Sequence, residues 1–121
     1  MKTYKARVHV ADTDSTGVLY FTALQRFALE AFESFLVEQG FELGEVFLPI
    51  VHAEADYTAP LKLWDEVEIR LSCSKIGESS FTIESELVGH GRVAIVHVCV
   101  DQDGNKVSVS DALKQLLAQL A

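Results

Sequence analysis

Long apolar runs and cysteines are scarce in this chain of 121 residues. No apolar stretch approaches the roughly 18 residues that a membrane-spanning helix needs, so the sequence indicates no membrane segment. The opening Met1–Lys5 carries charge with no apolar segment behind it, and we therefore expect no signal peptide. The two cysteines, Cys73 and Cys99, lie in strand-like runs and form no CxxC motif. This pattern is typical of reduced core thiols, and we expect a cytoplasmic protein.

Basic residues are also few, since 10 Lys and Arg face 18 Asp and Glu, which leaves a formal net charge of −8. That balance argues against nucleic-acid binding, which needs a basic surface. An anionic small ligand would need a local basic patch, although ordinary surface charge is the favoured interpretation of the candidates Lys62, Arg70, Lys75, Arg92 and Lys106. The histidines show no metal-ligand spacing, so we expect no metal and no cofactor; they are His9, His52, His90 and His97.

One long helix is the most strongly patterned element. The spacing predicts it over Phe21–Gln39, with Gly40 as the residue that ends it. Its apolar stripe, at steps of three and four, consists of Phe21, Leu24, Phe27, Ala28, Ala31, Phe32, Phe35 and Leu36.

Strand-like segments make up most of the remainder. We expect strands over 5–10, 49–59, 65–76, 81–87 and 92–100, and a short tail helix over 108–120 that Ser110 caps. The last strand is almost wholly apolar, so we expect it to be central and buried on both faces. Short turns predict an antiparallel meander, and hence an α+β fold: one domain, 1–121, in which an antiparallel sheet wraps around the long helix. A partly apolar outer face of the sheet predicts dimerisation.

An acidic turn lies between the first strand and the long helix. Its sequence is Asp12-Thr13-Asp14-Ser15-Thr16-Gly17-Val18-Leu19-Tyr20-Phe21. A carboxylate beside the electropositive end of a helix can attack a carbonyl and hold the resulting oxyanion. A calcium loop fits poorly, because its twelfth position needs Glu and here holds Ala23. A haloacid dehalogenase-like phosphatase, with Asp12 and Asp14 as its acidic pair, is a minor alternative that requires a parallel doubly wound fold.

The same turn resembles the D-x-D-x-x-G-x-V/L-Y/F signature of the 4-hydroxybenzoyl-CoA thioesterase family, which has the hotdog fold. A second region agrees, Pro49-Ile50-Val51-His52-Ala53-Glu54-Ala55-Asp56-Tyr57 followed by Pro60 and Asp65-Glu66-Val67. Within the family the chain is similar to 1,4-dihydroxy-2-naphthoyl-CoA thioesterases, on Gly17–Thr22, Glu30–Glu33 and Ile50–Ala53. Four positions depart from these relatives: Ala23, Leu24, Leu29 and Trp64, the last in place of a usual glycine.

The resemblance implies an acyl-CoA thioesterase in which Asp14 attacks the thioester carbonyl or activates a water. We expect the helix dipole to keep Asp14 ionised and Asp12 to be structural, as an Asx-type turn residue. Gly17 allows a positive φ or a close approach of ligand, and amides near Tyr20 and Phe21 would bind the oxyanion.

Three further residues are candidates for the substrate pocket. His52 would reach the pocket or a subunit boundary, with an ordinary core or interface histidine an equal alternative; Tyr57 and Thr58 are weaker candidates. The expected partners are an acyl-CoA substrate and further copies of the chain in a homodimer or homotetramer. A thioesterase for carrier-protein thioesters and a non-catalytic acyl-CoA-binding module stay open as alternatives.

Overall fold

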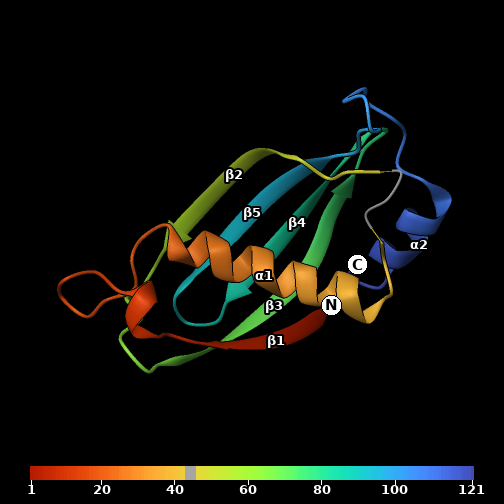
Figure 1. Cartoon of the computed structure of the whole chain (residues 1–121). Helices are drawn as coiled ribbons and strands as arrows, with labels where there is room; N and C mark the ends of the chain where they lie inside the picture. Colours follow the sequence, from red (N-terminus) through yellow and green to blue (C-terminus); the bar gives the residue numbers. More distant parts are fainter. Residues whose placement is uncertain (43–45) are drawn as a thin grey trace.

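The computed structural model describes residues 1–42 and 46–121, and it shows a sheet packed against one long helix (Figure 1). In chain order the elements are β1 (Lys2–Arg7), a 3-10 helix η1 (Val10–Asp12), α1 (Ala23–Glu38), β2 (Ile50–Tyr57), β3 (Glu66–Ile76), β4 (Ser80–Leu87), β5 (Gly91–Val98) and α2 (Asp111–Ala118). No helix within the described residues is long and apolar enough to cross a membrane.

The five strands lie in the order β1-β3-β4-β5-β2, and all four pairings are antiparallel. The α+β prediction is confirmed, and the phosphatase alternative is wrong for the described residues because it needs a parallel sheet. The meander is correct only for β3, β4 and β5. β2 pairs with β5, so residues 58–65 carry the chain from one side of the sheet to the other, where β3 pairs with β1.

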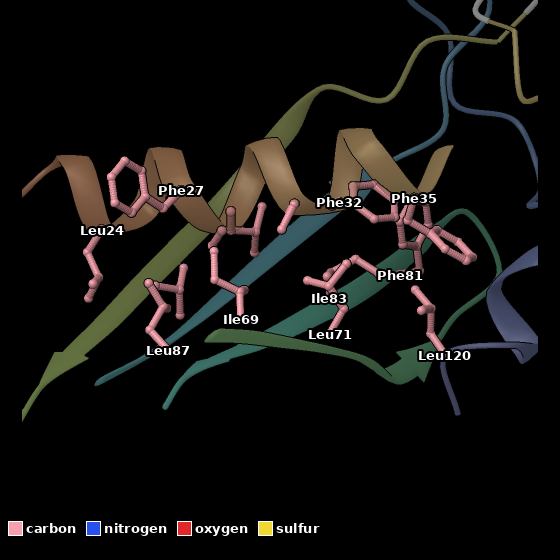
Figure 2. Packing of buried hydrophobic residues seen from close by; sticks show 14 of the residues in the cluster. Leu24, Phe27, Phe32, Phe35, Ile69, Leu71, Phe81, Ile83, Leu87 and Leu120 are labelled. Atoms are coloured by element: carbon pink, nitrogen blue, oxygen red, sulfur yellow. The ribbon is translucent and has the colours of Figure 1, made fainter. Parts of the chain in front are cut away.

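The core lies between the apolar stripe of α1 and the inner face of the sheet (Figure 2). Leu24, Phe27 and Phe32 from the helix are buried with Leu71 and Phe81 from the strands. Burying one such side chain stabilises the fold by roughly 1.5–3 kcal/mol. The predicted helix stripe is therefore the feature around which the sheet packs.

The end of α1 follows the predicted glycine cap. Gly40 has φ +69°, its amide donates to Val37 O over 3.0 Å, and the Phe41 amide donates to Leu36 O over 3.0 Å. This is a Schellman motif, which satisfies carbonyls that the helix leaves unpaired. In α2 the predicted cap is also present, because the Leu113 amide donates to the Ser110 hydroxyl over 3.1 Å.

Two strand predictions need correction. The first strand ends at Arg7, not at residue 10, because Val10–Asp12 turn into η1, where the Asp12 amide donates to His9 O over 2.9 Å. The last strand is not buried on both faces. Val93 and Ile95 are buried, whereas Ala94 and Val96, which alternate with them, are half-buried and Arg92 is exposed. The reason is that α1 covers one face of the sheet only (Figure 1).

Candidate active site

Asp14 lies on the exposed loop between η1 and α1. Its Oδ1 accepts from the Thr16 hydroxyl over 2.6 Å, from the Thr16 amide over 2.7 Å and from the Val18 amide over 3.4 Å. These bonds, the Thr16 hydroxyl first among them, hold the pKa of Asp14 below its ordinary value. The expected cause was the helix dipole, but the loop's own donors surround the carboxylate. Asp14, and not Asp12, therefore forms the Asx turn.

Gly17 shapes the same loop through its backbone. It has φ +78°, a region that favours glycine, and its amide donates to Asp14 O over 3.2 Å. The Leu63 amide donates to Gly17 O over 3.0 Å, and Val18 bridges to Lys62. The positive φ is as predicted, and these bonds fasten the acidic loop to the segment that crosses from β2 to β3.

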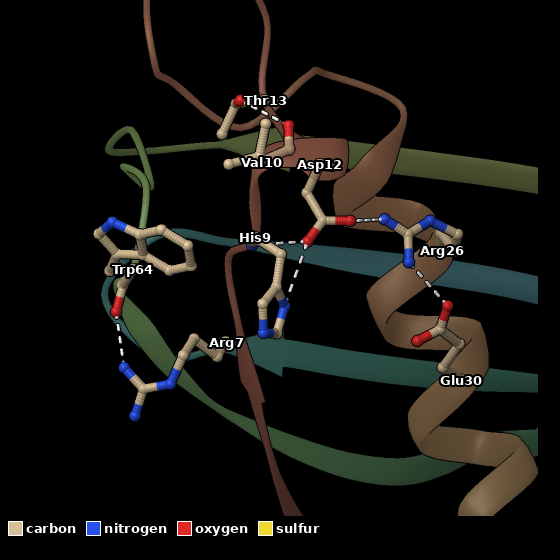
Figure 3. Close-up of polar contacts among 8 residues, drawn as sticks. All are labelled: Arg7, His9, Val10, Asp12, Thr13, Arg26, Glu30 and Trp64. Carbon is tan, nitrogen blue, oxygen red and sulfur yellow. Dashed lines mark hydrogen bonds and ion pairs between the residues drawn. The ribbon is translucent and has the colours of Figure 1, made fainter.

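Asp12 is buried and structural (Figure 3). Its Oδ2 accepts the His9 amide over 2.8 Å, and its Oδ1 forms an ion pair with Arg26, which also contacts Glu30 over 2.8 Å. Burial alone would raise the pKa of Asp12, but the His9 amide and Arg26 outweigh it and lower that pKa. The Asp12 carbonyl accepts the Tyr20 amide over 2.8 Å, so this one residue joins η1, the loop and α1.

The free amides at the start of α1 differ from the expected pair. The Tyr20 amide is occupied by Asp12 O, whereas neither the Phe21 nor the Thr22 amide donates to another described residue. The Tyr57 hydroxyl donates to the Phe21 carbonyl, which fixes the backbone at this point. Phe21 and Thr22 are therefore among the donors at the helix start that remain for an anion.

An open cavity of about 330 Å³ lies beside this helix start. That volume is at the lower end of small-molecule sites, which span about 300–1,000 Å³. Its lining is mostly apolar and consists of Val18, Leu19, Phe21, Leu24, Tyr57, Thr58, Ala59, Pro60, Leu61 and His90. Phe21 is 61% and Tyr57 50% exposed, so the outer wall of the cavity is open in a single chain.

The structure brings together three of the predicted site residues, Phe21, Tyr57 and Thr58. Asp14, Gly17 and Tyr20 lie on the adjoining loop outside the cavity lining, with Val18 as the link between the two. His52 is exposed on β2, away from the cavity, with its Nε2 3.9 Å from Glu54 Oε1. The described residues contain no group of three or more side chains that could hold a metal.

His90 is the lining residue that sequence reasoning missed. It lies in the turn between β4 and β5, and the sequence indicated only a glycine-flanked turn there. No local pattern could place it in the cavity, because its neighbours Thr58 and Ala59 are far away in the sequence. Its position follows from the pairing of β5 with β2.

Trp64 explains one departure from the family pattern. Its φ is +72°, a left-handed conformation in which glycine is usual and a bulky residue is uncommon. Its carbonyl accepts from Arg7 over 2.8 Å, and its ring lies edge-on to His9 with the centroids 6.1 Å apart (Figure 3). The turn thus keeps the backbone that a glycine would adopt, with contacts from Arg7 and His9 holding the tryptophan in place.

Comparison with known proteins agrees with this architecture. The model of the thioesterase-like superfamily matches residues 8–117. The chain is 36% identical over 105 residues to a 1,4-dihydroxy-2-naphthoyl-CoA hydrolase of Synechococcus elongatus, covering 78% of this chain and 77% of the relative. It is 31% identical over 133 residues to the hydrolase of that name from Rippkaea orientalis, covering 97% and 95%.

Solved structures show the same fold over nearly the whole chain. A 1,4-dihydroxy-2-naphthoyl-CoA thioesterase from Synechocystis has a TM-score of 0.85 at 27% identity, covering 98% of this chain and 96% of its own. A gentisyl-coenzyme A thioesterase has a TM-score of 0.84 at 26% identity, covering 96% and 99%. The chain therefore belongs to the thioesterase-like superfamily, has the hotdog fold and is a thioester hydrolase.

Proposed function

We propose that this acyl-CoA thioesterase hydrolyses an aromatic acyl-CoA of the 1,4-dihydroxy-2-naphthoyl type to the free acid and CoA. The observation that carries the proposal is the largely apolar cavity at the start of α1, next to the loop that holds Asp14. An apolar cavity suits a planar ring. The names of the relatives, 1,4-dihydroxy-2-naphthoyl-CoA hydrolase and gentisyl-coenzyme A thioesterase, supply the class of acyl group.

Asp14 is the reacting carboxylate in this proposal. In one route it attacks the carbonyl carbon, the C–S bond breaks, CoA leaves as the thiolate, and water then cleaves the mixed anhydride. In the other route Asp14 takes a proton from a water, that water attacks the same carbon, and the C–S bond again breaks with CoA leaving as the thiolate. In both, the oxyanion accepts hydrogen bonds from the Phe21 and Thr22 amides. Loss of one such donor typically costs roughly 2.7–4 kcal/mol of barrier.

The exposure of Asp14 in a single chain leads us to propose a homodimer as the working unit. β2 is an edge strand, and nearly all of its residues are exposed, including Val51 at 60%. An apolar edge strand with unpaired backbone groups is a template for pairing with another strand. A second copy at β2 would cover the open side of the cavity, because β2 ends at Tyr57 in its wall.

The test is release of free CoA thiol from naphthoyl-, benzoyl- and aliphatic acyl-CoAs, and from a carrier-protein thioester, by wild type and by Asp14→Asn. We expect the hydroxylated aromatic CoA esters to react best and the variant to lose about 10²–10⁴-fold in kcat. Asp103→Asn is the matched control, since Asp103 lies in an exposed turn far along the chain and should leave activity unchanged. Full activity of Asp14→Asn would remove Asp14 from the mechanism.

A further inference from the structure

We propose that His90 is a specificity-determining residue, whose imidazole accepts a hydrogen bond from a hydroxyl group on the acyl ring of the substrate. The proposal rests on the thioesterase function proposed above and deepens it. It assigns a polar contact to a cavity whose lining is otherwise mostly apolar.

His90 is held rigidly at the cavity wall. Its carbonyl accepts the Thr58 amide over 2.9 Å and the Ala59 amide over 3.3 Å, and its Nδ1 lies 3.2 Å from Ala59 O. Three bonds thus fasten the residue to the opposite wall segment. Two of these bonds fix the His90 backbone and the Nδ1 contact orients the ring, which gives a polar contact from this side chain a defined direction.

The close approach of the two walls depends on the next residue, Gly91. A Cβ built there would lie 2.3 Å from Asp56 O and 3.3 Å from Leu24 Cδ2. Only a residue without a side chain lets the β4–β5 turn lie directly against the end of β2. The glycine therefore lets His90 line the cavity.

The bond to Ala59 decides which nitrogen remains for a ligand. A carbonyl oxygen only accepts, so in the neutral ring Nδ1 carries the hydrogen and Nε2 holds the lone pair. Within the described part of the chain, Nε2 has no partner. Nε2 is thus a fixed acceptor, and its complement on a ligand is a hydroxyl donor.

The other polar side chains of the cavity, Tyr57 and Thr58, carry hydroxyl groups, which differ from Nε2 because they are donors as well as acceptors. The Tyr57 hydroxyl already donates to the Phe21 carbonyl at the helix start. The Thr58 hydroxyl rotates and can both donate and accept, so it orients a ligand less strictly. A ring with a hydroxyl opposite Nε2 would satisfy His90, whereas an unsubstituted ring would cover it and leave the nitrogen unpaired. A buried acceptor that loses its partner costs about 1–3 kcal/mol.

The experiment pairs each hydroxylated acyl group with its hydroxyl-free counterpart. Hydrolysis of 1,4-dihydroxy-2-naphthoyl-CoA and 2-naphthoyl-CoA is compared in wild type, His90→Leu and His90→Gln. Binding of the two free naphthoic acids is measured by calorimetry on the same proteins, and thermal unfolding checks that they are folded. Because hydroxyl groups change the intrinsic reactivity of a thioester, the informative quantity is the ratio between the two esters in each variant relative to wild type.

We expect His90→Leu to lower kcat/KM for the hydroxylated ester about tenfold and to leave the hydroxyl-free ester within about twofold. The preference for the hydroxylated acid in calorimetry should fall by the same factor, and His90→Gln should recover part of it because its amide oxygen accepts.

Equal losses for both esters, or no loss, would overturn the proposal. Failure of the thioesterase function looks different: no CoA ester is cleaved, yet the acids still bind with a preference that depends on His90. Absence of both hydrolysis and acid binding would overturn the two together.

Discussion

Arg26 on α1 forms an ion pair with the buried carboxylate of Asp12, and so joins the central helix to the loop that carries Asp14 (Figure 3). The two partners differ in burial. Asp12 is 7% exposed, while the Arg26 side chain is 46% exposed and also contacts Glu30. Arg26 neutralises the Asp12 carboxylate, which is buried because it holds other parts of the fold together. That carboxylate holds the His9 amide, and its backbone holds the Tyr20 amide at the entrance to α1.

Removal of that cation should destabilise the fold. Arg26→Met leaves the buried Asp12 carboxylate with the His9 amide alone, and we expect the free energy of unfolding to fall by about 1–3 kcal/mol. Because the pair lowers the pKa of Asp12 in the folded state, its stabilising effect is full above the unfolded value of 3.8 and is lost as pH falls through the lower folded value. Urea unfolding of both proteins should therefore differ at pH 7 and converge below about pH 4. Lys114→Met, on the exposed side of α2, is the control; an equal loss there would contradict this account.

Thr16 should set the pH dependence of the reaction. Thr16→Val removes the hydroxyl that contributes most to lowering the pKa of Asp14, so that pKa should rise towards its ordinary value. Asp14 must be ionised in either proposed route, and the acidic limb of the kcat/KM profile should move to higher pH. Thr13→Val removes a hydroxyl of the same loop that donates to Val10 O over 2.8 Å and not to Asp14, and its profile should match wild type. An unshifted limb in Thr16→Val would show that another group governs it.

His97 should make the fold sensitive to mild acid. Its ring is buried, with the centroids of Phe32 and Phe81 at 5.1 and 5.2 Å. Burial lowers the pKa of His97, although the Nδ1 contact with Leu48 O partly opposes this. A depressed folded pKa means that stability is lost as pH falls below the unfolded value of 6.5, by at most about 1.4 kcal/mol per pH unit. Urea unfolding between pH 7.5 and 5.5 should show this loss in wild type.

His97→Phe and His97→Gln separate the titration from the packing. Both should flatten the dependence on pH, because neither side chain titrates in this range, and Gln can keep a donor for the Leu48 carbonyl. Either variant is expected to be less stable than wild type at neutral pH. An unchanged slope in both would assign the acid sensitivity to other groups.

β2 should govern assembly and, through it, activity. Val51→Glu places charges at the exposed edge strand, where two copies would repel each other across the proposed interface. Sedimentation should show a change from dimer to monomer, accompanied by loss of hydrolysis. Val37→Glu alters a 78% exposed apolar residue on α1 and should leave the dimer intact. A wild-type monomer, or a Val51→Glu protein of unchanged mass, would refute the interface.

Helices and caps can be predicted from the sequence where residues close together in the chain determine them. The stripe of α1 and the glycine cap at Gly40 depend on residues within a few positions of one another, and the structure has both. The strand predicted over 5–10 lies too far along the chain, because β1 is Lys2–Arg7 and Val10 already belongs to η1. That 3-10 turn is held by Asp12 and its distant partner Arg26, which no local pattern contains.

Some residues of the candidate site can likewise be predicted from the sequence, and others only from the tertiary structure. Phe21, Tyr57 and Thr58 could be named from family motifs, and the structure gathers them in one cavity. His90 could not, because it enters that cavity only after β5 has paired with β2 and Gly91 has let the walls meet. The Tyr20 amide, near which the sequence predicts oxyanion donors, is occupied, and its acceptor Asp12 O is identified only by the closed loop.

What the sequence determined by itself was the composition of the core, the antiparallel α+β class and the acidic signature, since each arises from residue types at short, regular spacings. Only the tertiary structure decided the strand order, the cavity wall and the donors left free at the helix start. These depend on contacts between residues far apart in the chain, and such contacts exist only once hydrophobic burial has closed the sheet over the helix.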